Sequence, residues 1–178
     1  LAINSPGTSY DCGTMIASMY GSGGVPTVVL DLVTPVVEKA SSALETAAWD
    51  LRAEFPATCG IKLSSAYDAE TGMIDINAEL TSSTGGEYDL GFAILLNDQV
   101  IPSGTNDDGK YSHIVRAATG NYYMYSPAIQ SVEKDGKLSF SQSVASSGDV
   151  SDLSVVAFAL VKHTETARID NIVEAKVG

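Results

Sequence analysis

A change of hydrophobic period near Phe55–Pro56 constrains the fold of this chain more than any other feature. Before this dipeptide apolar residues recur every three or four positions, and after it they alternate with polar residues. A period near 3.6 residues is typical of an amphipathic helix, whereas alternation is typical of a strand with one buried face. The sequence therefore predicts a partial α/β segment over residues 1–56 and a β-rich domain over residues 57–178.

Residues 1–56 are predicted to form a helix, a strand and a second helix. The first helix is expected over Tyr10–Tyr20. The apolar run Val25–Leu32 favours a short strand buried on both faces. Thr34–Pro35 suits the start of the second helix, with Thr as N-cap and Pro at the first helical position. This helix would present one apolar stripe: Val37, Ala40, Leu44, Ala47, Leu51 and Phe55.

The remainder of the chain is predicted to be an antiparallel β-sandwich. About eight short strands, separated by turn signals every 8 to 12 residues or so, are typical of that architecture. We expect one buried face on the strand around 90–96, and central positions for the two most apolar strands, 153–161 and 169–177. The other strands are expected within 61–67, 74–80, 114–118, 128–133 and 138–144. The fold class is therefore mainly β, with the partial α/β segment preceding the sandwich.

Composition excludes several classes of protein. Ten Lys and Arg against 22 Asp and Glu give a formal charge of −12, which repels phosphate backbones, so nucleic acid is not an expected partner. A hydrophobic content of 44% argues against a disordered chain. No apolar run approaches the roughly 20 residues that a membrane-spanning helix needs.

Candidate catalytic and metal-binding residues are sparse. His113 and His163 are the only histidines, and neither has a Cys or a second His at metal-ligand spacing. No Gly-x-Ser-x-Gly motif marks a hydrolase nucleophile. The acidic stretches 68–70 and 106–109 lack the spaced carboxylates of a calcium loop and are expected to be hairpin tips. We therefore predict no catalytic residue, no metal and no cofactor.

The cysteines and one aromatic cluster leave alternatives open. Cys12 and Cys59 do not form a Cys-x-x-Cys motif, so each is expected to be a small buried residue, although a bridge between them is an alternative in an oxidising compartment. Tyr122, Tyr123 and Tyr125 offer a contact surface for a sugar or a protein, or else cover the mouth of the sandwich.

Two groups of residues carry a family resemblance. Tyr20–Leu30, with its Gly-Val-Pro-Thr sequence, resembles the helix–loop–strand of thioredoxin folds, which implies a cis peptide bond before Pro26. The second group comprises Tyr111–Ala118 followed by Gly120, and Leu153–Phe158 near the end. Together they resemble the twenty-eight-kilodalton outer-membrane-protein family of Bacteroidetes, exported lipoproteins with a thioredoxin-like N-terminal part and a C-terminal β-sandwich.

The resemblance implies a location and a class of function. The protein would be exported to the outer membrane, cell surface or periplasm, and held at the membrane only by a lipid anchor upstream of Leu1. His113 and Arg116 match family positions but inherit no catalytic role. The expected function is a non-catalytic envelope module that binds an unidentified protein or glycan. The alternatives are the back half of a thiol-disulfide oxidoreductase whose dithiol lies upstream, and a carbohydrate-binding module. Self-association through residues 1–56 is also expected, because a strand without neighbours there invites pairing.

Overall fold

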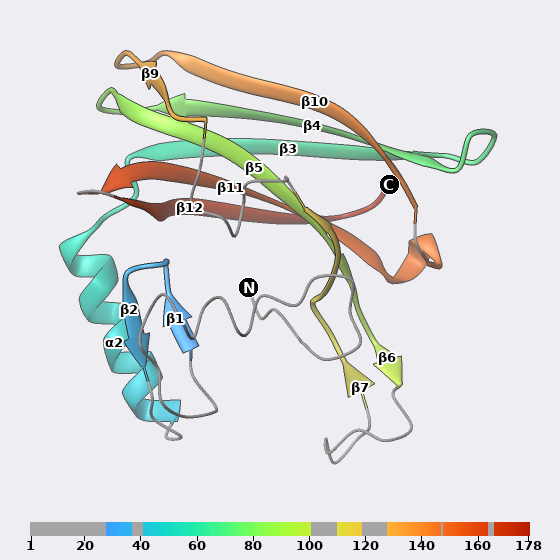
Figure 1. The fold of residues 1–178 in the computed structure, drawn as a ribbon, viewed down its shortest axis with the longest axis horizontal. Helices are drawn as coiled ribbons and strands as arrows, with labels where there is room; N and C mark the ends of the chain where they lie inside the picture. The colour runs from blue at the N-terminus through green and yellow to red at the C-terminus, as the bar shows by residue number, and fades with distance from the viewer. Residues whose placement is uncertain (1–27, 37–40, 101–109, 119–127, 147, 164–165) are drawn as a thin grey trace.

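The computed structural model describes residues 28–36, 41–100, 110–118, 128–146, 148–163 and 166–178. Most of these residues form two antiparallel sheets packed face to face, so the predicted β-sandwich is confirmed (Figure 1). The strands of the sandwich are β3 (Cys59–Asp68), β4 (Met73–Ser82), β5 (Gly86–Leu96), β8 (Ile114–Ala118), β9 (Gln130–Val132), β10 (Lys137–Ala145), β11 (Leu153–His163) and β12 (Thr166–Lys176). One sheet has the order β10–β4–β3, and the other has the order β12–β11–β5–β8, with β9 also paired to β5.

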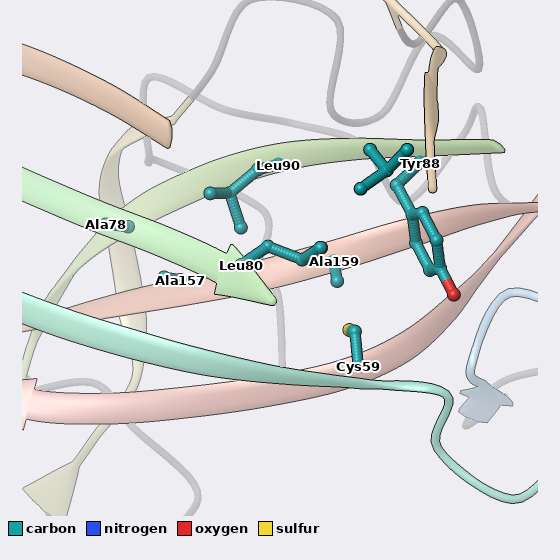
Figure 2. Packing of buried hydrophobic residues seen from close by; sticks show 8 residues of the cluster. Cys59, Ala78, Leu80, Tyr88, Leu90, Ala157 and Ala159 are labelled. Atoms are coloured by element: carbon teal, nitrogen blue, oxygen red, sulfur yellow. The ribbon is translucent and has the colours of Figure 1, made fainter. Parts of the chain in front are cut away.

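Alternation along the strands fills the space between the sheets. On β4, Ile74, Ile76, Ala78 and Leu80 are buried, while the residues between them are exposed or half-buried. Figure 2 shows one end of this core, where leucines of β4 and β5 lie beside the small residues Ala157 and Ala159 of β11. The Tyr88 ring is buried there as well, and its hydroxyl bonds Thr58 Oγ1 at 2.7 Å.

The central strands of the five-stranded sheet are buried on both faces. Residues Leu90–Leu96 were predicted to bury one face, and this prediction is wrong because Ala93 and Leu95 pack into a further cluster on the outer side of the sheet, with Leu32 against it. A strand that is buried on both faces has a continuous run of apolar residues, and residues 90–96 form such a run. The predicted central position of β11 is confirmed. The prediction that β12 is central is wrong, since within the described ranges β12 lies at the margin of the sheet and pairs only with β11.

The described part of the N-terminal segment is a hairpin followed by a helix. Strands β1 (Val28–Leu30) and β2 (Thr34–Val36) pair antiparallel around a turn in which Asp31 and Leu32 have positive φ. The predicted helix start at Thr34–Pro35 is therefore wrong: Pro35 lies in a two-stranded hairpin, where a residue without an N–H is tolerated. Helix α2 (Ser41–Glu54) begins seven residues after Thr34.

Helix α2 faces the molecule with the later part of the predicted stripe, while Val37 and Ala40 lie outside the described residues. Leu51 is buried, and Leu44, Ala47 and Phe55 are half-buried, whereas Trp49 on the other side is 69% exposed. The helix ends at Glu54 and β3 begins at Cys59, on either side of the change of period. The first predicted helix lies outside the described residues, and the division into two domains stays a prediction.

A buried carboxylate joins these elements. Asp170 of β12 is 0% exposed, and its Oδ2 accepts the backbone N–H groups of Thr58 (2.8 Å) and Cys59 (3.1 Å) at the start of β3. Its Oδ1 lies 3.1 Å from the Arg168 guanidinium, which lies over the Phe55 ring at 5.0 Å from the centroid. A charge in the core is tolerated only when it is paired and hydrogen-bonded in this way.

The helix and the hairpin attach to the same place. The Arg52 guanidinium donates to the carbonyl of Asp170 at 3.3 Å, and Ile169 N–H donates to the carbonyl of Asp31 at 2.9 Å. Burial raises the pKa of the Asp31 carboxyl, and the nearby guanidinium groups of Arg52 and Arg168 oppose that rise. Asp170 and its neighbours therefore hold α2, the hairpin, β3 and β12 together.

Replacing this carboxylate should be costly. We expect D170N to lower the free energy of unfolding by about 3–5 kcal/mol, because it leaves the Arg168 charge buried without a counter-charge. The measurement is urea unfolding followed by circular dichroism. D50N, at an exposed position on α2, is the matched control and should change stability by less than about 0.5 kcal/mol. A loss below about 1 kcal/mol for D170N would show that the ion pair is dispensable.

Candidate functional site

The outer face of the three-stranded sheet is hollowed into a groove. The hollow has a volume of about 720 Å³ and is lined by three residues from each strand: Lys62, Leu63 and Ser64; Asn77, Ala78 and Glu79; Ser139, Phe140 and Ser141. Strand register places the polar ones in two rows across the sheet, Lys62–Glu79–Ser139 and Ser64–Asn77–Ser141. We call this surface the outer groove.

Short outward side chains explain the groove. The strands alternate at the groove, so Leu63, Ala78 and Phe140 pack toward the core. The outward residues between them are short and polar: Ser64, Asn77, Ser139 and Ser141. Hydroxyl and amide groups both donate and accept hydrogen bonds, so these rows can bind a polar ligand laid across the strands. The sequence predicted all three strands but not their register, so it could not show that these residues lie together.

Charges lie at one end of the outer groove. Glu79 accepts a 2.8 Å hydrogen bond from Lys137 Nζ, and this bond lowers the pKa of the Glu79 carboxyl. Glu79 therefore carries its negative charge at neutral pH. A ligand at this end would meet a carboxylate that is already paired, and an ammonium group of Lys62 on the neighbouring strand.

His113 lies at a kink in a long hairpin. The pair β5 and β8 continues beyond this kink as β6 (Gln99–Val100) and β7 (Lys110–Tyr111). Asp98 and His113 have φ of +53° and +60°, on the two sides of the kink. The His113 N–H donates to Asn97 Oδ1 at 2.9 Å, and the Asp98 N–H donates to Ser112 Oγ at 3.2 Å. Side chains thus replace the interrupted backbone ladder.

The side chain of His113 takes part in a second polar contact. Its Nε2 lies 3.5 Å from Glu174 Oε2, and the other oxygen of Glu174 accepts a 2.6 Å hydrogen bond from Ser154 Oγ. Ser154 is buried and also accepts from Asn97 Nδ2 at 3.0 Å. A hydrolytic triad needs the histidine between serine and carboxylate, whereas here the carboxylate lies between. This arrangement therefore orients β12 and the kink and does not activate Ser154.

Arg116 lies in a β-bulge. Leu95 pairs with Val115 and Ile94 with Ala117, so Arg116 is the extra residue of β8. Its Nε is buried and has no hydrogen-bond partner among the described residues. Bulges redirect a side chain relative to a regular strand. No hydrogen bond or ion pair joins Arg116 to His113 among the described residues, and Pro26, Tyr122, Tyr123 and Tyr125 lie outside those residues.

The surroundings of Cys59 make its thiol chemically unreactive. The thiol is free and buried, and burial together with the Asp170 carboxylate beside it raises its pKa to about 12. A thiol that stays protonated is a poor nucleophile, which agrees with the small buried residue expected from the sequence. His163, the other histidine, lies edge-on to Phe55 with ring centroids 5.1 Å apart.

Two further features of the described ranges bear on chemistry. The acidic turn at 68–70 is a hairpin tip, as expected, since Asp68 accepts from Glu70 N–H and the Thr71 hydroxyl, which lowers the pKa of its carboxyl. In the part of the chain that the structure describes, no three His, Cys, Asp or Glu residues are placed to hold a metal ion.

None of the helices in that part combines the length and the apolar character that crossing a membrane requires.

Comparisons with known proteins give only distant similarity. No protein-family model and no curated protein matches the chain, so membership of the outer-membrane-protein family stays a prediction. Among solved structures, R. palustris CsgH is 9% identical with a TM-score of 0.31, covering 66% of this chain and 91% of that one. The sporulation control protein Spo0M of Bacillus subtilis is 7% identical with a TM-score of 0.41, covering 68% and 48%. A β-glucosidase of Kluyveromyces marxianus is 10% identical with a TM-score of 0.32, covering 68% and 14%.

The role of position 113 can be tested through its backbone. A residue other than glycine at positive φ costs about 1–2 kcal/mol, so H113G should be more stable than H113A by about 1 kcal/mol. The measurement is thermal and urea unfolding of both variants beside the parent chain. Equal stability of the two variants would contradict the kink geometry described above.

Proposed function

We propose that the protein is a non-catalytic interaction module of the bacterial cell envelope that binds its partner through the outer groove. The observation that carries this proposal is the groove itself, in which two rows of short polar side chains lie on an exposed sheet face. Surfaces of this kind hold a ligand by hydrogen bonds and not by covalent chemistry. An exported location rests on the resemblance alone and is part of the proposal.

Polar groups outside the groove are engaged in contacts within the protein, which supports a binding function for the groove. Ser154, Glu174 and His113 are engaged in orienting strands, and Asp170 with Arg168 is engaged in joining elements. The two rows of the outer groove, in contrast, lie on the exposed side of a sheet whose inner side already forms the core. Their hydrogen-bonding groups are therefore the ones that face an incoming partner.

The test combines cross-linking in cells with binding of the purified partner. A photo-reactive side chain in place of Asn77, at the centre of the groove, should yield a discrete cross-linked adduct in the envelope of the producing bacterium. The control places the same side chain at Asp50, which is exposed on α2 and should yield no such adduct. The partner identified in this way should bind the purified chain saturably, and N77R should weaken binding at least about tenfold, or roughly 1.4 kcal/mol, by filling the groove.

Two results would contradict the proposal. Equal adducts from both positions would show that contact with the groove is non-specific. Saturable turnover of a substrate by the purified chain would show that the function is catalytic.

A further inference from the structure

We infer that strand β10 is a docking edge for a second copy of this chain, which pairs with it antiparallel and joins the two three-stranded sheets into one six-stranded sheet. The inference rests on the exposed margin of the sheet and goes beyond the proposed function, since the edge would pair even if the groove bound nothing. Sheet edges recruit strands because their outer N–H and C=O groups lack partners.

The two margins of the three-stranded sheet differ. At the β3 margin, the other sheet closes the sandwich: Tyr67 N–H donates to the carbonyl of Gly178 and Asn171 Nδ2 donates to the carbonyl of Cys59, both at 2.8 Å. At the β10 margin, β4 is the only strand that pairs with β10 among the described residues. Figure 1 shows β10 as the outermost strand of the sandwich on that side.

Strand β10 lacks the features that usually protect an edge. It has nine residues, pairs with β4 in one unbroken register, and contains no proline. Its single charged residue is Lys137, at the first position. The five-stranded sheet is different, because its margin opposite β12 consists of strands of five and three residues and its β5–β8 pairing contains a bulge. Short strands and bulges are typical protections of an edge, and β10 has neither.

The inward row of β10 is incompletely covered. Leu138, Phe140 and Val144 pack against the core clusters, yet each is only half-buried because the sheet ends at this strand. Phe140 contacts Phe92 across the core, with ring centroids 5.7 Å apart. A further strand at this margin would complete the burial of these side chains, which is a favourable hydrophobic contribution.

The sequence of β10 is compatible with pairing to itself. With a twofold axis at Ser141, antiparallel register places Leu138 opposite Val144, Ser139 opposite Ser143, and Lys137 opposite Ala145. No like charges meet in this register, and like charges directly opposite each other are what destabilises such pairs. The chain carries 22 acidic residues in all, yet none lies in Lys137–Ala145. A second copy is therefore an electrostatically acceptable occupant at this strand, although the whole chain carries a charge of −12.

Pairing would also enlarge the outer groove. Ser139 and Ser141 line it on β10, so the twofold axis would set the grooves of two copies side by side on one continuous sheet face. Net repulsion between two copies with a charge of −12 each should make the dimer tighten as salt screens the long-range term.

The test is sedimentation velocity of the purified chain up to about 1 mM, the range in which weak specific interfaces are populated. We expect a reversible dimer. S139K/S143K sets ammonium groups opposite each other across the axis and should raise the dimer dissociation constant at least about tenfold. Within one copy each of these lysines would face an acidic residue of β4, Glu79 or Asp75, so the fold should tolerate the change, which a thermal melt checks.

Two control variants make the test specific for register and for strand. S139K alone changes one of the same positions but leaves each ammonium group opposite the neutral Ser143 of the other copy, and within one copy it still faces Glu79, so the dimer should persist. S64K, on the same sheet face at the β3 margin, should leave the dissociation constant unchanged. A strictly monomeric parent chain, or a dimer equally strong in S139K/S143K, would overturn the inference; in the latter case the interface lies elsewhere, for example in residues 1–56.

Discussion

The buried carboxylate of Asp170 is the interaction on which the rest of the architecture depends. It lies on β12 and accepts backbone N–H groups from the start of β3, which belongs to the other sheet. Its partner Arg168 lies over Phe55 at the end of helix α2, and Arg52 of the helix returns to its backbone carbonyl. One charged group thereby specifies where two sheets and a helix meet. Burying the two charges is costly, so the pair adds little net stability, but removing one partner leaves the other charge buried and uncompensated.

The sandwich is closed at the β3 margin of the three-stranded sheet, so the β10 margin is the one that can bind another molecule. The residues that join β3 to β12 form their hydrogen bonds within the molecule, and so do the polar residues around His113. The outer groove and β10 are different, since a polar row and an open strand edge lie next to each other on one sheet. Ligand binding in the outer groove and strand pairing at β10 are independent of each other, but both follow from the same asymmetry between the margins.

Local sequence pattern predicted more of the fold than of the site. Alternation located the strands well because each buries a regular row of side chains, as Ile74 and Ile76 do on β4. It placed Thr34–Pro35 wrongly, because a Thr-Pro pair suits a helix start and a hairpin strand alike, and only the contacts with β1 decide between them. The outer groove depends on register between strands distant in sequence, and register is a tertiary property that no single segment encodes.

Residue-resolved amide hydrogen exchange in dilute solution tests whether the sandwich is closed by β12 at one margin and open at β10. An edge strand bonds a neighbour through every second residue only. We expect amides along Lys137–Ala145 to alternate between slow and fast exchange, while those of the central strand β4 are uniformly slow. Uniformly slow exchange along β10 in the monomer would contradict an open margin there, because it would mean that another strand already covers this edge.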